Sequence, residues 1–382
     1  MESAAKKEER KVEYSELIYD LIFVYIIGRN NSLLHDVGGG FVSLGTFIAY
    51  VLCTLAVIQI WNFTTFYINM YGRNGLRDHI FMFVNMYLLY FVAEGTRVHW
   101  QAYHGQYHFA WAAILINIGV QYLIESRNHK NGSYDKEIIT HMMTVLFGEA
   151  AIVLAAVPVY ELTGAELAPL AIMFGIFVTM IIGRKNRNST VDFAHLSERA
   201  MLYVVFTFGE MIIAISSYFE GEISLNTVYF SLMAFLIVGG LFLSYGTLYD
   251  SILDREMQTS GMGYMLIHVF LIFALNNITA ALEFMHSEEV ELMPKTIFLI
   301  ASFLIYYVFL FLTGRYAKLK CRPSKAFCIK MLVGAVGFVL IMLICRNIMW
   351  LNIAVTVVCV FAVYLVMYRI GKVSKNNMVS KK

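Results

Sequence analysis

The side chains of this chain that could do chemistry are ionisable groups inside one strongly apolar stretch. That stretch, residues 192–217, is apolar enough to cross a bilayer, yet it contains His195, Glu198, Arg199 and Glu210. An ionised side chain near the centre of a membrane helix costs about 2.5–3.5 kcal/mol. Such groups persist where they pair with one another or line a wet cavity, so the stretch predicts a polar centre inside a membrane bundle.

A weaker copy of this pattern, H-M-M-T-V-L-F-G-E-A-A-I-V-L-A, begins at His141 and contains Glu149. If the two helices face each other, Glu149 and Glu210 lie near one level in low dielectric. Both are then protonated unless a cation or a basic partner lies between them. Alternatively, each is neutral and hydrogen-bonded to a neighbouring helix for packing. The preceding glycines, Gly148 and Gly209, predict the close approach of a neighbouring backbone.

Two further pairs lie four residues apart, which places each pair on one helical face. Glu16 and Asp20 are close enough to share a proton or to recruit a cation; alternatively, Glu16 caps the helix start, where the helix dipole favours acids. His195 and Arg199 form the second pair. Arg199 either extends to the cytoplasmic end of the membrane or forms an internal salt bridge, with Glu198 or with Asp20.

The remaining histidines give weaker signals. His268 is either a satisfied core group or, with Asn276 eight residues on, part of a polar path. His99, His104 and His108 lie in the loop before the fourth predicted helix and could bind zinc, but nothing fixes a geometry, so we expect no metal site. We expect no catalytic residue either. The candidate substrate- or ion-binding residues are Glu16, Asp20, His141, Glu149, His195, Glu198, Arg199, Glu210 and His268.

The composition is that of a polytopic membrane protein. Hydrophobic residues make up 59% of the 382 residues and charged residues 15%, against about 45–50% and 25% in soluble domains. A mean hydropathy of +0.65 leaves no room for a large soluble domain. No P-loop is present, and we expect no cofactor and no nucleic-acid partner. The expected partners are the lipid bilayer and a small solute, ion or proton, with a homo-oligomer left open.

Apolar stretches near the roughly 20 residues that cross a bilayer predict an all-α bundle of about twelve spans. Their approximate ranges are 16–34, 41–67, 78–97, 107–125, 138–159, 167–183, 195–218, 225–249, 259–285, 294–313, 326–345 and 348–369. With the N-terminus in the cytoplasm, the outer loops receive only Arg29, Arg97, Lys295 and Arg346. Since Lys and Arg accumulate on the cytoplasmic side, both termini are predicted to be cytoplasmic.

This layout divides the chain into four regions. Residues 1–12 form a charged cytoplasmic segment, and residues 13–285 form a polar-centred membrane core of nine spans. Every outward-running helix of that core carries a carboxylate. Residues 286–370 contain three almost wholly apolar spans, which are typical of a scaffold or an oligomer surface. Residues 371–382 form a basic cytoplasmic tail.

Two sequence blocks resemble the low temperature requirement A (LtrA) family. E-L-I-Y-D-L-I-F-V-Y-I-I at residues 16–27 resembles the family's opening pattern, and residues 195–215 resemble its H-x-x-E-R…G-E block. Residues 61–71 and the segment around His268 are similar more loosely, so that the matches cover about two thirds of the chain. The chain departs from the family at residues 72–74, where an acidic cluster is usual. The resemblance implies a multi-pass protein of a bacterial-type cell membrane, in a family whose molecular activity is not established.

Three classes of function fit these observations. The leading hypothesis is a proton-coupled secondary transporter or channel-like pathway that uses the mid-membrane carboxylates. The second is an intramembrane enzyme acting on a lipid or isoprenoid substrate, with His141 and His195 as acid, base or metal ligands. No H-E-x-x-H, D-D-x-x-D or G-x-S-x-G signature supports that hypothesis. The third is a membrane sensor or scaffold, which requires a dry and fully paired core.

Overall fold

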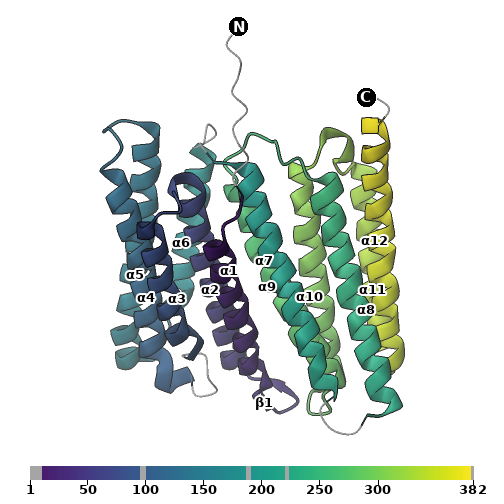
Figure 1. Ribbon diagram of the computed structural model, residues 1–382. Coiled ribbons are helices and arrows are strands. Elements are labelled where there is room, and N and C mark those ends of the chain that lie inside the picture. Colours follow the sequence, from purple (N-terminus) through teal and green to yellow (C-terminus); the bar gives the residue numbers. More distant parts are fainter. Residues whose placement is uncertain (1–10, 95–99, 186–190, 220–222, 380–382) are drawn as a thin grey trace. The chain divides into compact units, whose positions relative to one another are not determined.

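The structure is a computed structural model that describes residues 11–94, 100–185, 191–219 and 223–379. In these residues twelve α-helices follow one another, and the strands form one two-residue hairpin (Figure 1). The α-helices are α1 (Tyr14–Asn30), α2 (Leu44–Tyr71), α3 (Leu76–Glu94), α4 (Trp100–Ser126), α5 (Tyr134–Thr163), α6 (Ala168–Lys185), α7 (Phe193–Ala214), α8 (Leu225–Thr247), α9 (Met262–His286), α10 (Leu292–Leu312), α11 (Lys325–Ile344) and α12 (Met349–Val379). The hairpin strands are β1 (Val37–Gly38) and β2 (Phe41–Val42), and the shorter helical turns are η1 (Asn31–His35), η2 (Ile215–Phe219), η3 (Leu248–Ile252), η4 (Thr313–Tyr316) and η5 (Leu319–Cys321).

The predicted all-α membrane architecture is confirmed in its general form. Nine described helices are long and apolar enough to cross a membrane. Two more, α1 and α3, fall outside that group, and α6 contributes a shorter apolar segment, Ala168–Ile181. These helices fit a multi-pass membrane protein.

The chain forms two compact units. The first contains Met1–Ile26, Leu55–Tyr203 and Arg255–Leu266, and the second contains Ile27–Thr54, Val204–Asp254 and Ile267–Lys382. Four helices, α1, α2, α7 and α9, contribute residues to both units.

In the first unit, α4 packs against both α3 and α5, and α6 packs against α5. Local sequence signals delimit α5: the Ser133 hydroxyl accepts a hydrogen bond from the Lys136 N–H at the helix start. At its end, Gly164 has φ +71°, a left-handed conformation that glycine adopts without steric cost. The fourth helix begins earlier than predicted. Since α4 starts at Trp100, His104 and His108 lie in its first turns and not in a loop.

In the second unit, α8 packs against α12, and the π-helical turn η3 continues α8 toward the same neighbour. The hairpin contacts the turn before α10, where the Glu291 N–H donates to the Gly40 carbonyl at 2.7 Å. On α11, only 11% of the most apolar window is buried within the chain. This helix therefore presents apolar side chains to its surroundings, as a helix facing lipid does.

Gly148 and Gly209, the glycines that precede Glu149 and Glu210, differ in their surroundings. A Cβ built on Gly148 would lie 2.8 Å from the Phe174 ring, so the predicted close approach is present and is made by a side chain. At Gly209 the prediction is wrong, because no described atom lies within 4 Å of such a Cβ. The repeated Phe-Gly-Glu sequence therefore marks tight packing in one copy only.

This difference predicts opposite tolerance at the two positions. Gly148→Leu should lower the free energy of unfolding by about 1–3 kcal/mol, because the new side chain overpacks against Phe174. Gly209→Leu should leave the thermal unfolding midpoint of the detergent-solubilised protein unchanged or slightly higher, since leucine favours helix over glycine. Equal midpoints for the two variants would contradict this account of Gly148.

Candidate functional site

A cluster of buried charged side chains lies in the first unit, on α1 and α7. Arg199 is its centre: its Nη1 lies 3.2 Å from Glu16 Oε2, and its Nη2 donates to Asp20 Oδ1. All three side chains are at most 3% exposed. Arg199 is therefore internal, in agreement with a salt bridge to Asp20 and in contradiction to an extension toward the membrane surface. Glu198, the other partner considered for it, is half-buried and forms no ion pair with a described residue.

Asp20 is held on one of its two oxygens. The indole N–H of Trp61, on α2, donates to Asp20 Oδ1 at 2.8 Å, beside the bond from Arg199. Trp61 is itself fixed against Tyr203, with ring centroids 4.4 Å apart. The second oxygen, Oδ2, is buried and accepts no hydrogen bond from the described residues. That oxygen is the point of the cluster where a proton or a small cation could bind.

The hydrogen bonds of Asn69 fix the protonation of His195. Asn69 Oδ1 accepts the Asp192 N–H at 3.1 Å, and Asn69 Nδ2 donates to the Asp192 carbonyl at 2.9 Å. These two backbone contacts leave Nδ2 as the donor toward His195 Nδ1, at 3.0 Å. His195 is thus the neutral tautomer with its proton on Nε2, 3.4 Å from Glu16 Oε2. Adding a second proton at Nδ1 would break the bond from Asn69.

A chain of polar side chains continues from the cluster across the unit. Tyr19, the neighbour of Asp20, shares a hydrogen bond of 2.9 Å with Thr64 on α2. Asn85 Nδ2, on α3, donates to the Tyr19 hydroxyl at 3.3 Å, and Asn117 Nδ2, on α4, donates to Asn85 Oδ1 at 2.9 Å. Such a chain of buried hydrogen bonds ties α1, α2, α3 and α4 to one another.

Glu149, on α5, has a simpler environment. Its carboxyl is fully buried and accepts one hydrogen bond, from Gln59 Nε2 at 3.2 Å. Its other oxygen accepts none from the described residues. Gly175, on α6, makes room for this pair, because a Cβ there would collide with both side chains. His141, on the same helix as Glu149, is half-buried, and its Nδ1 has no described hydrogen-bond partner.

The other predicted residues belong to the second unit. Glu210 packs its carboxyl against Gly28 of α1, in the space that a Cβ would occupy. The buried His268 forms a hydrogen bond of 3.1 Å with Tyr245, while Asn276 donates to the Tyr50 hydroxyl at 2.9 Å. Glu149 and Glu210 thus lie in different units, and their proposed pairing stays a prediction.

Two ionic clusters of the first unit are not among the predicted site residues. Glu125, 1% exposed at the end of α4, accepts from Arg73 at 3.1 Å and from Arg77 at 3.2 Å. Arg73 lies in the segment where the sequence departs from the family pattern, and Arg77 lies in the first turn of α3. The sequence signal for this cluster was the presence of opposite charges near the end of α2, the start of α3 and the end of α4. This signal is weak, because charged side chains at helix ends are often solvated.

The second cluster contains His104, His108 and Glu166. His104 Nε2 lies 2.9 Å from Glu166 Oε2, and His108 Nε2 lies 3.4 Å from Glu166 Oε1. Burial raises the pKa of the Glu166 carboxyl, but its contacts with His104 and His108 and the hydrogen bond from the Ala168 N–H outweigh it and hold the pKa below its ordinary value. His99, the third histidine of the sequence motif, lies outside the described residues.

Comparison with known families decides the classification of the chain. The model of the family "Bacterial low temperature requirement A protein (LtrA)" matches residues 11–364. The chain belongs to the LtrA family. That match includes every residue of the cluster around Arg199 in this LtrA protein, and it covers all of the described helices but the end of α12. A comparison with curated proteins finds no match to the chain.

The buried position of Arg199 predicts a large stability effect. Arg199→Met leaves Glu16 and Asp20 without the guanidinium between them, and we expect unfolding to become easier by about 3–5 kcal/mol. The measurement is the thermal unfolding midpoint of the detergent-solubilised protein. Replacing the exposed Glu161 by Gln is the matched control and should not change the midpoint. A midpoint for Arg199→Met equal to that of the control would contradict the pairing.

Proposed function

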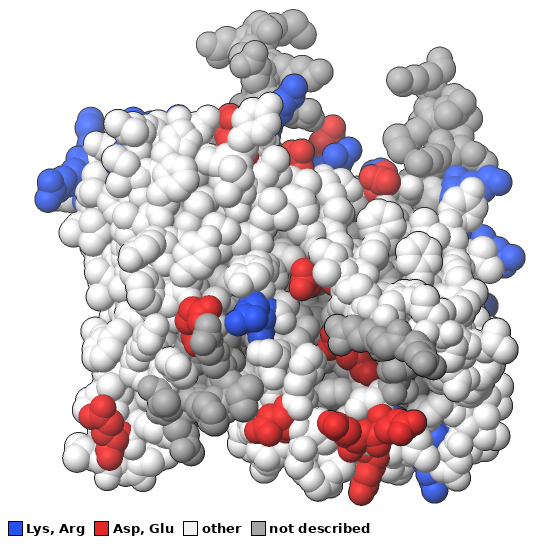
Figure 2. Space-filling view, turned by 60° about the horizontal axis from the view of Figure 1, so that its bottom comes forward, with Lys and Arg blue, Asp and Glu red and all other residues white. Residues whose placement is uncertain are grey.

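We propose that this LtrA protein is a proton-coupled secondary transporter or channel-like pathway for a small solute or ion. It crosses the plasma membrane twelve times, with both termini in the cytoplasm. The distribution of Lys and Arg in the sequence supports this orientation. Figure 2 shows that most of the visible surface carries no charged side chain, as expected where helices face lipid.

The observation that carries the proposal is the shared guanidinium of Arg199. One cation contacts two carboxylates, those of Glu16 and Asp20, and so compensates one full negative charge. Asp20 also keeps a buried oxygen, Oδ2, with no described hydrogen-bond donor. A second negative charge at this depth is costly, and a proton or a small cation at Oδ2 removes the cost. If Asp20 served only to pack helices together, a buried oxygen without a hydrogen-bond donor would lower stability with no compensation.

Proton binding at Asp20 changes how strongly ion pairs join α1 to α7. When Asp20 is ionised, Arg199 is drawn to it and the two helices are held together. When Asp20 is protonated, Arg199 pairs with Glu16 alone, and the hold on Asp20 weakens. The buried position of the cluster then requires that α1 or α7 move before the proton exchanges with water, which is the behaviour of an occluded site in alternating access.

Glu149 provides a second protonatable group in the same unit. Because Gln59 is its one described hydrogen-bond donor, the ionised carboxylate is poorly compensated, and we expect Glu149 to be neutral in this conformation. Gln59 lies on α2, the helix that also supplies Trp61 to Asp20. A movement of α2 therefore acts on both carboxyl groups.

The proposal is tested by proton flux into vesicles. Purified protein is reconstituted with a pH-sensitive dye inside, and a pH gradient or membrane potential is applied while candidate solutes are screened. We expect Asp20→Asn to reduce proton movement at least tenfold, because the amide cannot release a proton. Glu149→Gln should reduce it by a similar factor.

The Glu161→Gln variant, exposed at the end of α5, is the control for both and should transport like the unmodified protein. Insertion of each variant is checked by its yield in the vesicles. Wild-type flux in both Asp20→Asn and Glu149→Gln would remove the proposed coupling.

A further inference from the structure

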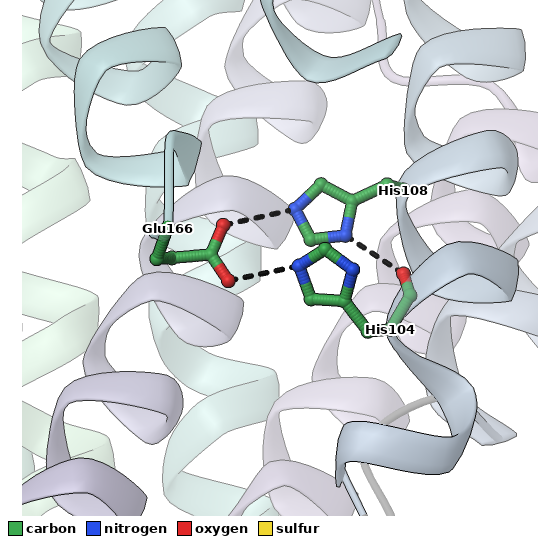
Figure 3. Close-up of side chains that lie close together, drawn as sticks. All are labelled: His104, His108 and Glu166. Carbon is green, nitrogen blue, oxygen red and sulfur yellow. Dashed lines mark hydrogen bonds and ion pairs between the residues drawn. The ribbon is translucent and has the colours of Figure 1, made fainter. Parts of the chain in front are cut away.

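A second cluster of ligating side chains lies away from Arg199, where the start of α4 meets the turn between α5 and α6. His104 and His108 are four residues apart, so one face of α4 presents both imidazoles. Glu166 approaches from the turn, and Figure 3 shows its carboxylate pointing at both rings. One ligand atom from each of the three residues can be chosen so that all lie within 4.8 Å of one another.

The hydrogen bond on the far side of His108 sets its tautomer. His108 Nδ1 lies 2.8 Å from the His104 carbonyl, an acceptor, so Nδ1 carries the ring proton. In the neutral ring, Nε2 then carries a lone pair. This lone pair points at Glu166 Oε1, which is also an acceptor and lies 3.4 Å away. Two acceptors that face each other in a buried site require a proton or a cation between them. Metal-bound histidines show this same arrangement, with the second ring nitrogen donating to a carbonyl or carboxylate.

The surrounding residues hold the three side chains in place. Tyr160 stacks on His104, with ring centroids 4.0 Å apart, and the Ala168 N–H donates to Glu166 Oε1 at 3.1 Å. His104 and His108 are at most 3% exposed, whereas the Glu166 side chain is 24% exposed. A ligand would therefore enter from the side of Glu166. The exposed carboxylate and the two enclosed rings form a partly preorganised site.

We propose that His104, His108 and Glu166 bind a divalent transition-metal ion of the zinc type. Two imidazole nitrogens and one carboxylate oxygen are the donor set that such ions favour, and three protein ligands leave a fourth position open. Metal–ligand bonds of about 2.0–2.2 Å require the three ligand atoms to close in slightly around the ion. Binding at His104 Nε2 requires that its ring proton move to Nδ1 or leave to solvent.

The position of the site gives the ion two roles. It would join α4 to the α5–α6 turn, and so stabilise the unit that contains the Arg199 cluster. In the proposed orientation of the chain, the site is on the outer side of the membrane. The ion is then taken from outside the cell, and the open coordination position faces the same side. From the sequence alone no metal site was expected here, because nothing fixed a geometry for these histidines; their common face on α4 supplies one.

Zinc binding to the full-length protein in detergent is the test. The protein is treated with a chelator, which is then removed, and zinc chloride is titrated while bound zinc is measured after dialysis. We expect about one zinc per chain, a higher thermal unfolding midpoint with zinc, and an affinity at least tenfold weaker in Glu166→Gln and in His108→Asn. Glu161→Gln, five residues from Glu166 and exposed, should bind zinc like the unmodified protein.

X-ray absorption at the zinc edge of the unmodified protein gives a result that needs no variant. The proposal predicts nitrogen and oxygen neighbours with the outer-shell pattern of imidazole. Sulfur neighbours, an absence of zinc in the unmodified protein, or variants that bind as tightly as it does would each overturn the site. None of these outcomes bears on the flux expected from Asp20, so the two proposals fail separately.

Discussion

A single buried guanidinium organises the polar centre of this protein. Arg199 bridges Glu16 and Asp20 where almost no solvent reaches, so each of the three charges depends on the others. Desolvating such a group costs several kcal/mol, and only direct contact with an opposite charge offsets that cost. The bridge therefore fixes α7 against α1 more strictly than apolar packing does, because a small displacement leaves a charge unpaired. Trp61 adds a hydrogen bond to Asp20, and Asn69 holds the neighbouring His195.

The same pairing explains why protonation of Asp20 could change the contacts of Arg199. Arg199 has two carboxylate partners and one charge to divide between them, and a proton on Asp20 alters that division. Both α1 and α7 contribute residues to the first unit and to the second. His195 lies beside the cluster, with its Nδ1 hydrogen-bonded to Asn69. In the proposed mechanism the exchangeable position of the cluster is Asp20 Oδ2, the oxygen that accepts no described hydrogen bond.

Helical spacing predicted a substantial part of this site. The four-residue separations of Glu16 from Asp20 and of His195 from Arg199 placed each pair on one face, and those faces meet. The hydrogen-bond donors from α2 could not be predicted, because nothing in a single sequence says which helix turns Trp61 or Asn69 toward α1 and α7. At the second Phe-Gly-Glu sequence the prediction of close packing was wrong. Gly209 lies in open space, although its neighbours in the sequence resemble those of Gly148. The sequence identified His104 and His108 as possible zinc ligands but predicted no metal site, because a loop does not give two histidines a common face. In the structure α4 starts earlier than hydropathy indicates, and the helix supplies that face.

The central claim is that Asp20 takes up and releases a proton, and that the pairing of Arg199 with Asp20 weakens when it does. Infrared difference spectroscopy between acidic and alkaline pH tests it most directly, in a Glu149→Gln background that removes one further buried carboxyl of the first unit. The account predicts a protonated-carboxyl band that appears at acidic pH and that is lost when Asp20 is also replaced by Asn. Identical difference spectra with and without Asp20 would contradict it.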